Sequence, residues 1–132
     1  MAEASYPEDL LYHPEHDWAR IDPQDGSLAT LGITWYAQDS LGEVVFFDPP
    51  AVGSTVAKDA PYAEVESVKA VSDVVAPLSG EIVAVNDSLP DNPARINDDP
   101  YGEGWLVRIR MSDPGEREAL MDASSYRATL GG

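Results

Sequence analysis

The chain has 132 residues, 43% of them hydrophobic and 24% charged, a composition typical of a globular protein rather than a disordered one. Its 24 acidic and 8 basic residues give a formal net charge of −16, which would repel nucleic-acid phosphates. The absence of cysteine excludes disulfides and thiolate metal sites, and no apolar run is long enough to span a membrane. The first ten residues lack the basic and apolar features of a targeting peptide. We therefore expect a single domain over residues 1–132, monomeric and located in the bacterial cytoplasm, although a mature mitochondrial protein would look similar.

The first half of the chain is predicted to alternate short strands with one helix. Apolar and polar residues alternate over 27–31, and a more buried strand is predicted over 42–47. The residues between these strands have the pattern of a short helix over 34–41, with Thr34 as its N-cap and Gly42 as its end.

The second half is predicted to be mostly β and to end in helix. Four more strands are expected, at 63–68, 71–76, 80–85 and 105–110. The sequence Asp113-Pro114-Gly115-Glu116 has the form of a capping box with proline at the first helical position. It predicts a helix over 116–121, followed by a short helical turn over 124–130.

An internal repeat supports this layout. Gly42-Glu43-Val44-Val45 resembles Gly80-Glu81-Ile82-Val83, and Pro61-Tyr62-Ala63-Glu64 resembles Pro100-Tyr101-Gly102-Glu103 at nearly the same offset. The chain is therefore predicted to contain two similar β units in tandem, connected by the hairpin of residues 63–76.

Lys69 is the strongest candidate for a functional residue, and it would lie at the tip of that hairpin. The chain has only two lysines, and the other, Lys58, lies in a turn-like segment. A primary amine can be acylated to a neutral amide, which removes its charge and adds a long arm. An exposed amine on a tight turn, flanked by Glu66 and Asp73, fits a swinging-arm carrier. On spacing alone, a solvated surface lysine is the simpler interpretation.

His13 and His16 are the only histidines, and they stand beside Glu15 and Asp17. A metal centre needs a third ligand and supporting residues around it, and the chain has no further histidine or cysteine to supply them. We therefore interpret both histidines as structural or surface residues and expect no metal site.

The sequence around Lys69 resembles the H proteins of the glycine cleavage system, a family of lipoyl carriers. The matching segments include Val65-Glu66-Ser67-Val68-Lys69-Ala70, Ser72-Asp73, Leu41-Gly42-Glu43-Val44-Val45-Phe46, and Asp99-Pro100-Tyr101-Gly102-Glu103-Gly104-Trp105-Leu106. Near the N-terminus, Glu15-His16-Asp17-Trp18 resembles the entry motif of the family. The likeness extends from about residue 12 to residue 126.

The resemblance implies a mainly β fold, a barrel-sandwich hybrid of the biotinyl and lipoyl carriers with a short internal helix and a C-terminal helix. It implies covalent lipoate on Lys69, which lipoylating enzymes would recognise through Glu66, Ser67, Ala70 and Asp73. The family's carriers are not enzymes. They shuttle an aminomethyl group from a pyridoxal-phosphate glycine decarboxylase to a tetrahydrofolate-dependent aminomethyltransferase, and dihydrolipoamide dehydrogenase reoxidises them.

Members of the family also hold the loaded arm in a surface cleft, away from water. By position, the cleft residues implied here are Glu15, Asp17, Ile33, Leu41 and Asp73. The chain departs from the family pattern in this region. Asp17 stands where glutamate is common, Tyr62-Ala63 replaces Phe-Gly, and the turn at Lys58-Asp59 lacks the usual glycine.

Three other interpretations remain open at this point. A biotin carrier usually has methionine on both sides of its lysine, whereas Val68 and Ala70 flank Lys69 here. An H-like protein that relays lipoate to other enzymes would have the same hairpin sequence. An unmodified β interaction module would need no lipoyl group at all.

Overall fold

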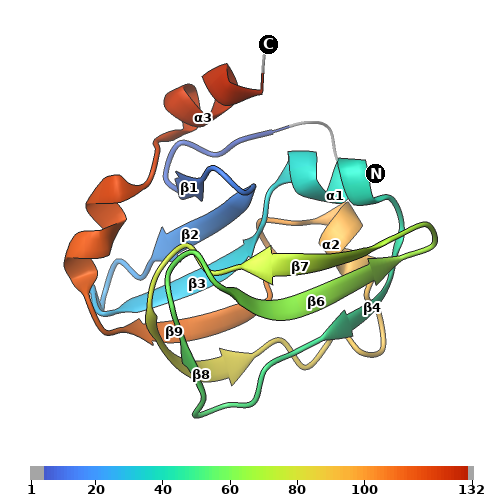
Figure 1. The fold of residues 1–132 in the computed structure, drawn as a ribbon, viewed down its shortest axis with the longest axis horizontal. Helices are drawn as coiled ribbons and strands as arrows, with labels where there is room; N and C mark the ends of the chain where they lie inside the picture. The colour runs from blue at the N-terminus through green and yellow to red at the C-terminus, as the bar shows by residue number, and fades with distance from the viewer. Residues whose placement is uncertain (1–4, 131–132) are drawn as a thin grey trace.

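The structure is a computed structural model that describes residues 5–130. Nine strands form two antiparallel sheets (Figure 1). The larger sheet has the order β1-β2-β3-β9-β8-β5, with β1 at Leu11–His13, β2 at Asp17–Ile21, β3 at Leu28–Ile33, β9 at Val107–Met111, β8 at Gly80–Val85 and β5 at Thr55–Val56. The smaller sheet has the order β4-β6-β7, with β4 at Val44–Asp48, β6 at Pro61–Ser67 and β7 at Val71–Val75.

The two sheets pack face to face around the main hydrophobic core. Leu31, Ile82 and Ile109 from the larger sheet are fully buried, and Phe47 and Val65 from the smaller sheet are almost so. The alternation of Val107-Arg108-Ile109-Arg110-Met111 shows how the sequence specifies this arrangement, because every second side chain of β9 is buried and the two arginines are exposed. The sheets do not close into a barrel, and the predicted barrel-sandwich hybrid is confirmed.

The helices are short and lie at the margins of the sheets. They are α1 at Trp35–Leu41, α2 at Arg95–Asp98, the 3₁₀ helix η1 at Pro114–Ala119, and α3 at Ala123–Thr129. The prediction for α1 is confirmed in detail. The Thr34 hydroxyl accepts a hydrogen bond from the Ala37 N–H, and Gly42 ends the helix with a φ of 87°.

The predicted capping box after residue 112 is wrong. Asp113 does cap η1, by accepting a hydrogen bond from the Gly115 N–H. Glu116 does not reach back to Asp113, because its carboxylate accepts hydrogen bonds from the Ser79 backbone N–H at 2.8 Å and the Ser79 hydroxyl at 2.9 Å. The segment is a 3₁₀ helix that starts two residues before the predicted α-helix.

A second cluster of buried aromatic residues joins the two ends of the described chain. Tyr12 and Tyr126 stack with their ring centroids 4.8 Å apart, and Trp18 and Tyr101 are buried beside them. The Tyr12 backbone exchanges two hydrogen bonds with Met121. This cluster fixes the segment from His13 to Asp17, whose side chains take part in the candidate site.

No helix of residues 5–130 is long and apolar enough to cross a membrane.

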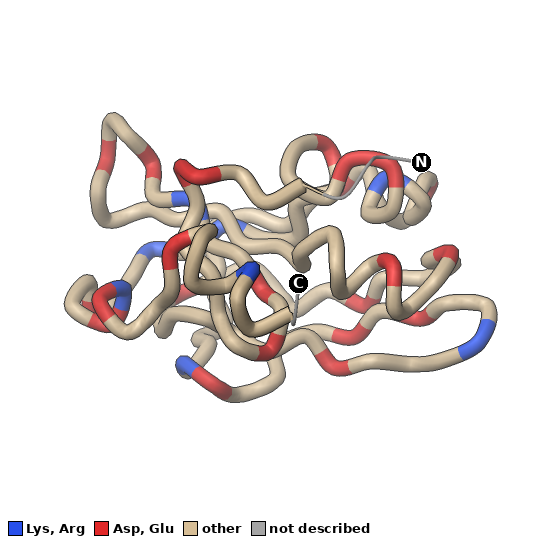
Figure 2. Tube along the Cα trace, turned by 90° about the horizontal axis from the view of Figure 1, so that it is seen from above, with Lys and Arg blue, Asp and Glu red and all other residues tan. Residues whose placement is uncertain are grey.

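The halves of the predicted repeat fall in different sheets. β4 pairs with β6 in the smaller sheet, whereas β8 pairs with β9 in the larger one. The β6–β7 hairpin lies between them in sequence, as predicted, and it projects from the body of the molecule (Figures 1 and 2).

Candidate functional site

Lys69 lies at the tip of the β6–β7 hairpin, in a turn that the Ser67 side chain organises. The Ser67 Oγ accepts hydrogen bonds from the backbone N–H groups of Lys69 at 3.2 Å and Ala70 at 3.1 Å. The Ser67 N–H donates to the Ala70 carbonyl at 2.8 Å, which closes the turn. A serine hydroxyl commonly stabilises a tight turn by bonding the backbone two or three residues ahead. The turn therefore presents Lys69 without using its side chain.

The amine of Lys69 is available for chemistry. The residue is exposed, and within residues 5–130 its Nζ has no hydrogen-bond acceptor or carboxylate in contact. The tip is nevertheless held in place, because the Val68 N–H donates to the Glu43 carbonyl at 3.2 Å. Gly42, with its left-handed backbone, lies beneath the lysine stem. A Cβ at that position would be 3.5 Å from Lys69 Cε.

The predicted recognition residues lie on or beside this tip. Glu66 pairs with Val71 and Asp73 pairs with Glu64, so the two acids lie on opposite strands of the hairpin. Ser67 is buried in the turn, whereas Ala70 and Asp73 are exposed. Three of the four residues are thus at least partly accessible near Lys69, whereas Ser67 shapes the turn from within, and the role of all four in recognition stays a prediction.

A cavity of about 340 Å³ lies beside the hairpin, between β7, α1 and the segment that precedes β2. Its lining includes Glu15, Asp17, Ile33, Leu41 and Asp73, so the structure brings together all the residues that the resemblance implies for an arm cleft. Ala70 and Val71 also line the cavity. Because Ala70 directly follows Lys69, one end of the cavity lies beside the hairpin tip. Sequence reasoning missed Tyr36 and Ser40, which α1 contributes to the same wall.

Asp17 is the unusual group in this cavity. Its residue is only 2% exposed, and its Oδ2 has no hydrogen-bond partner within residues 5–130. Burial, with a smaller contribution from the negative charge of Glu15, raises the pKa of the Asp17 carboxyl well above its usual range. A buried carboxyl without a partner destabilises the fold, which makes Asp17 a candidate for a functional role.

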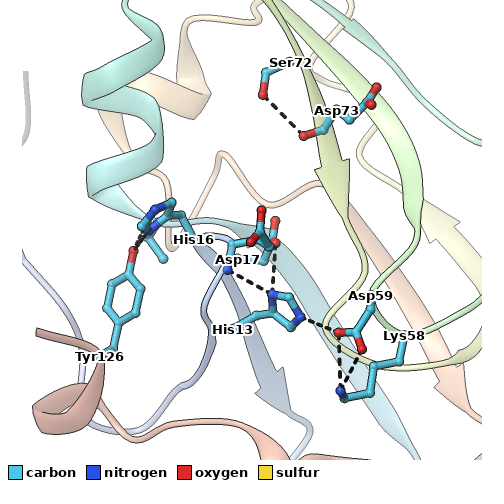
Figure 3. A network of polar contacts seen from close by, with 10 residues as sticks. His13, His16, Asp17, Lys58, Asp59, Ser72, Asp73 and Tyr126 are labelled. Atoms are coloured by element: carbon cyan, nitrogen blue, oxygen red, sulfur yellow. Dashed lines mark hydrogen bonds and ion pairs between the residues drawn. The ribbon is translucent and has the colours of Figure 1, made fainter. Parts of the chain in front are cut away.

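His13 connects Asp17 with the turn that contains the second lysine (Figure 3). The His13 Nδ1 accepts a hydrogen bond from the Glu15 N–H at 3.0 Å, so the proton of the neutral ring is on Nε2, which donates to Asp59 at 2.6 Å. The Nδ1 atom lies 3.9 Å from Asp17 Oδ2 and offers it no proton. Asp59 also pairs with the Lys58 amine at 3.2 Å.

This network explains how the chain manages without glycine in the turn at Lys58-Asp59. Asp59 has a φ of 73°, in the left-handed region that usually favours glycine. Aspartate is among the residues that tolerate this conformation, and its hydrogen bonds to His13 and Lys58 hold it there. The same bonds lower the pKa of the Asp59 carboxyl.

Tyr62 is a second buried polar group that the sequence did not predict as functional. Its hydroxyl has no hydrogen-bond partner within the described chain. Burial raises the pKa of this hydroxyl, and the nearby Asp17 raises it further. Because Asp17 and Tyr62 come from different sheets, only the tertiary structure brings them near each other.

The two histidines have structural contacts. His13 is buried in the network above, and His16 Nδ1 hydrogen-bonds the Tyr126 hydroxyl at 2.8 Å (Figure 3). No cluster of three or more residues suited to a metal ion occurs within residues 5–130. Within residues 5–130, the structure thus combines a two-sheet β fold with a lysine amine that has no partner, on a hairpin beside a partly apolar cavity, which are features of a carrier protein.

Comparison with known proteins identifies the family. The family model for glycine cleavage H-protein matches residues 10–131. Proteins named glycine cleavage system H protein from Rubrobacter xylanophilus and Myxococcus xanthus are 53% and 49% identical to the chain, over 96% and 94% of both sequences respectively. A crystal structure of a glycine cleavage system H protein from Mycobacterium marinum superposes with a TM-score of 0.85 at 42% identity, covering 96% of this chain and 99% of that one.

The chain belongs to the glycine cleavage H-protein family. Its fold and length match the family throughout, and the comparisons support the role of a carrier subunit in glycine cleavage. They do not favour the alternative in which the protein relays lipoate to other enzymes.

Proposed function

We propose that Lys69 is the site of lipoyl attachment, and that the chain is a non-catalytic lipoyl carrier. The observation that supports this most is the exposed amine, which has no partner within residues 5–130 and lies on a turn that Ser67 closes, in a protein of the H-protein family. When attached, the lipoyl group would supply a disulfide that is reduced as it takes up an aminomethyl group, and the dithiol left after that group is passed on would be reoxidised by dihydrolipoamide dehydrogenase. The chain itself would present the arm and shelter its end from water.

The cavity beside Lys69 suits the end of a loaded arm. Its wall combines apolar side chains such as Ile33, Leu41 and Val65 with the carboxyl groups of Glu15 and Asp17. Apolar walls would exclude the water that hydrolyses a labile aminomethyl group. A volume of about 340 Å³ is in the range of small-molecule sites.

Asp17 is proposed to bind the cationic amine of the cargo. Without a cation nearby, burial favours its protonated form, and an arriving ammonium would favour the carboxylate instead. The resulting charge-assisted hydrogen bond would satisfy the Oδ2 atom, which lacks a hydrogen-bond partner among residues 5–130. Binding of the cargo and ionisation of Asp17 would then occur together.

The proposed partners follow from this cycle. They are a pyridoxal-phosphate glycine decarboxylase, a tetrahydrofolate-dependent aminomethyltransferase, dihydrolipoamide dehydrogenase and the lipoylating enzymes. Since the relatives are bacterial, we place the cycle in a bacterial cytoplasm and expect the carrier to act as a monomer.

The chain offers a matched pair of variants to test the proposal. Lys69→Arg keeps the positive charge but cannot form the lipoyl amide, and Lys58→Arg makes the same change at the only other lysine. In a reconstituted system we expect Lys69→Arg to lose all glycine-dependent release of carbon dioxide, while Lys58→Arg retains it. Activity of the Lys69→Arg variant in this assay would overturn the proposal.

A further inference from the structure

The outward face of the smaller sheet bears three carboxylates in a single row. Asp48 of β4 pairs in register with Glu64 of β6, and Glu64 pairs with Asp73 of β7. Residues paired in this way point to the same side of an antiparallel sheet, with their Cβ atoms about 4.5–5.5 Å apart. All three side chains are exposed, and they line one surface hollow of about 310 Å³. We call Asp48, Glu64 and Asp73 the carboxylate row.

The next row of the same face, closer to Lys69, is largely apolar. Phe46, Glu66 and Val71 are in register across the three strands. Phe46 is 49% exposed and Val71 is 61% exposed, and Val68 at the hairpin tip is 70% exposed. Exposed apolar side chains bordered by charged ones are the usual composition of a protein-binding surface.

The carboxylate row places like charges side by side on the sheet. Like charges directly opposite each other on a sheet are destabilising. Within residues 5–130, no lysine, arginine or histidine forms an ion pair with any of the three. Along the projecting hairpin, Figure 2 shows acidic segments on the strands and a basic segment at the end. A cationic surface on a partner would supply the missing counter-charges.

We propose that the carboxylate row, with the apolar row beside it, is the docking surface for the enzyme that acylates Lys69. The partner would present arginine or lysine side chains next to an apolar residue. Asp73 is only four residues from Lys69, at most about 14 Å of extended chain, so an enzyme that brings its reactive centre to Lys69 Nζ would lie close to this face. The inference rests on the proposed modification of Lys69.

Two triple variants with the same change in net charge separate local docking from the overall acidity of the chain. The first is Asp48→Asn with Glu64→Gln and Asp73→Asn. The control is Asp87→Asn with Asp91→Asn and Glu118→Gln, three exposed acids outside the smaller sheet. None of the six side chains forms a hydrogen bond or ion pair within residues 5–130, so both variants should fold, which circular dichroism would verify.

The measurement is kcat/KM for transfer of lipoate to the unmodified protein by a purified lipoate ligase at low and high salt. We expect the row variant to lose roughly tenfold in kcat/KM at low salt through KM, and to be less sensitive to salt than the wild type. The control should stay within about twofold of the wild type. Equal losses in both variants, or no loss in the row variant, would overturn the docking surface. A wild-type protein that the ligase does not modify would instead count against the proposed function.

Discussion

The two lysines of the chain occupy turns that are built in opposite ways. The turn at Lys58 depends on charge, because the amine pairs with Asp59 and Asp59 in turn accepts a hydrogen bond from His13. The turn at Lys69 depends on the backbone and one serine hydroxyl, and the amine at its tip has no partner in the described chain. One lysine is part of the structure, whereas the other is left free for a reaction.

This difference shows what a modifiable lysine requires. A side chain that stabilises its own turn cannot be acylated without loss of that stabilisation, whereas Ser67 allows Lys69 to lose its charge at no cost to the hairpin. Asp17 lies between the two turns, 3.9 Å from His13 on one side and in the cavity beside the hairpin on the other. Four substitutions test this contrast.

The largest effect is expected from His13→Ala, which breaks the turn that depends on charge. It removes a buried ring and both of its hydrogen bonds, to Asp59 and to the Glu15 N–H. We expect a loss of about 2–3 kcal/mol in the free energy of unfolding, measured with urea. Lipoylation of Lys69 at a temperature where the variant is folded should be unchanged. A defect in lipoylation under those conditions would mean that the two turns are not independent.

His13→Ala should also change how stability depends on pH. The hydrogen bond from His13 lowers the pKa of Asp59, so this pair stabilises the fold above the carboxyl's unfolded pKa and loses that effect as the pH falls. Acidification from pH 6 to pH 3 should therefore narrow the difference in stability between the wild type and the variant. A constant difference over this range would contradict the assigned hydrogen bond between His13 and Asp59.

The second effect concerns the cavity and is tested with Asp17→Asn. If Asp17 binds the cationic end of the arm, its loss should increase the rate of cargo hydrolysis roughly tenfold, which corresponds to one charge-assisted hydrogen bond of about 1.4 kcal/mol. The rate would be followed as ammonia released from the loaded, lipoylated protein without the aminomethyltransferase. Asp39→Asn, on the exposed side of α1, is the matched control. Equal rates in both variants would remove Asp17 from the proposal.

Asp17 should also affect stability with the sign opposite to that of Asp59. Its pKa is raised in the folded protein, so its contribution to stability is fully present below the unfolded pKa and is lost as the pH rises through the folded pKa. Relative to Asp17→Asn, the unmodified wild type should therefore become less stable as the pH rises from about 4 towards neutrality. Urea unfolding of both proteins across that range provides the check.

The third effect is that of Ser67→Ala, which weakens the turn at Lys69. It removes the acceptor for two backbone N–H groups at the hairpin tip. We expect about 1 kcal/mol of destabilisation and slower lipoylation, because the tip would lose its fixed geometry. Ser67→Thr retains the hydroxyl and should restore much of the rate. Unchanged kinetics in Ser67→Ala would show that the ligase imposes the turn itself.

The smallest effect is expected from Lys58→Met. It removes an ion pair with an exposed carboxylate but keeps most of the apolar stem. The melting temperature should stay within about 2 °C of the wild type, as followed by circular dichroism. A larger decrease would mean that Lys58 contributes more to its turn than a surface ion pair does.

Local rules were sufficient for the parts of the molecule that depend on neighbouring residues. Thr34 and Gly42 define α1, and β8 occupies the predicted range of 80–85. β6 and β7 form the predicted hairpin, with small differences at their ends. The strands β1, β2 and β5 were not predicted. β1 and β5 have only three and two residues, too few for a clear alternation, and the five residues of β2 do not alternate between apolar and polar.

The features that the sequence alone could not supply depend on contacts between distant residues. Glu116 bonds Ser79, 37 residues away, and so cannot complete the capping box that its spacing suggested. Likewise, Asp17 affects the pKa of the buried Tyr62 hydroxyl only because the fold brings the two sheets together. The resemblance to the family named five residues that line one cavity, and their role as an arm cleft stays a prediction. It could not show that Asp17 Oδ2 lacks a hydrogen-bond partner within residues 5–130.

The most direct test of the central claim is peptide mapping by mass spectrometry of the wild-type protein after incubation with lipoate, ATP and a lipoate ligase. The account predicts one lipoyl group per chain, located on the peptide that contains Lys69, with Lys58 unmodified. A protein that remains unmodified, or one that is modified on Lys58, would contradict it.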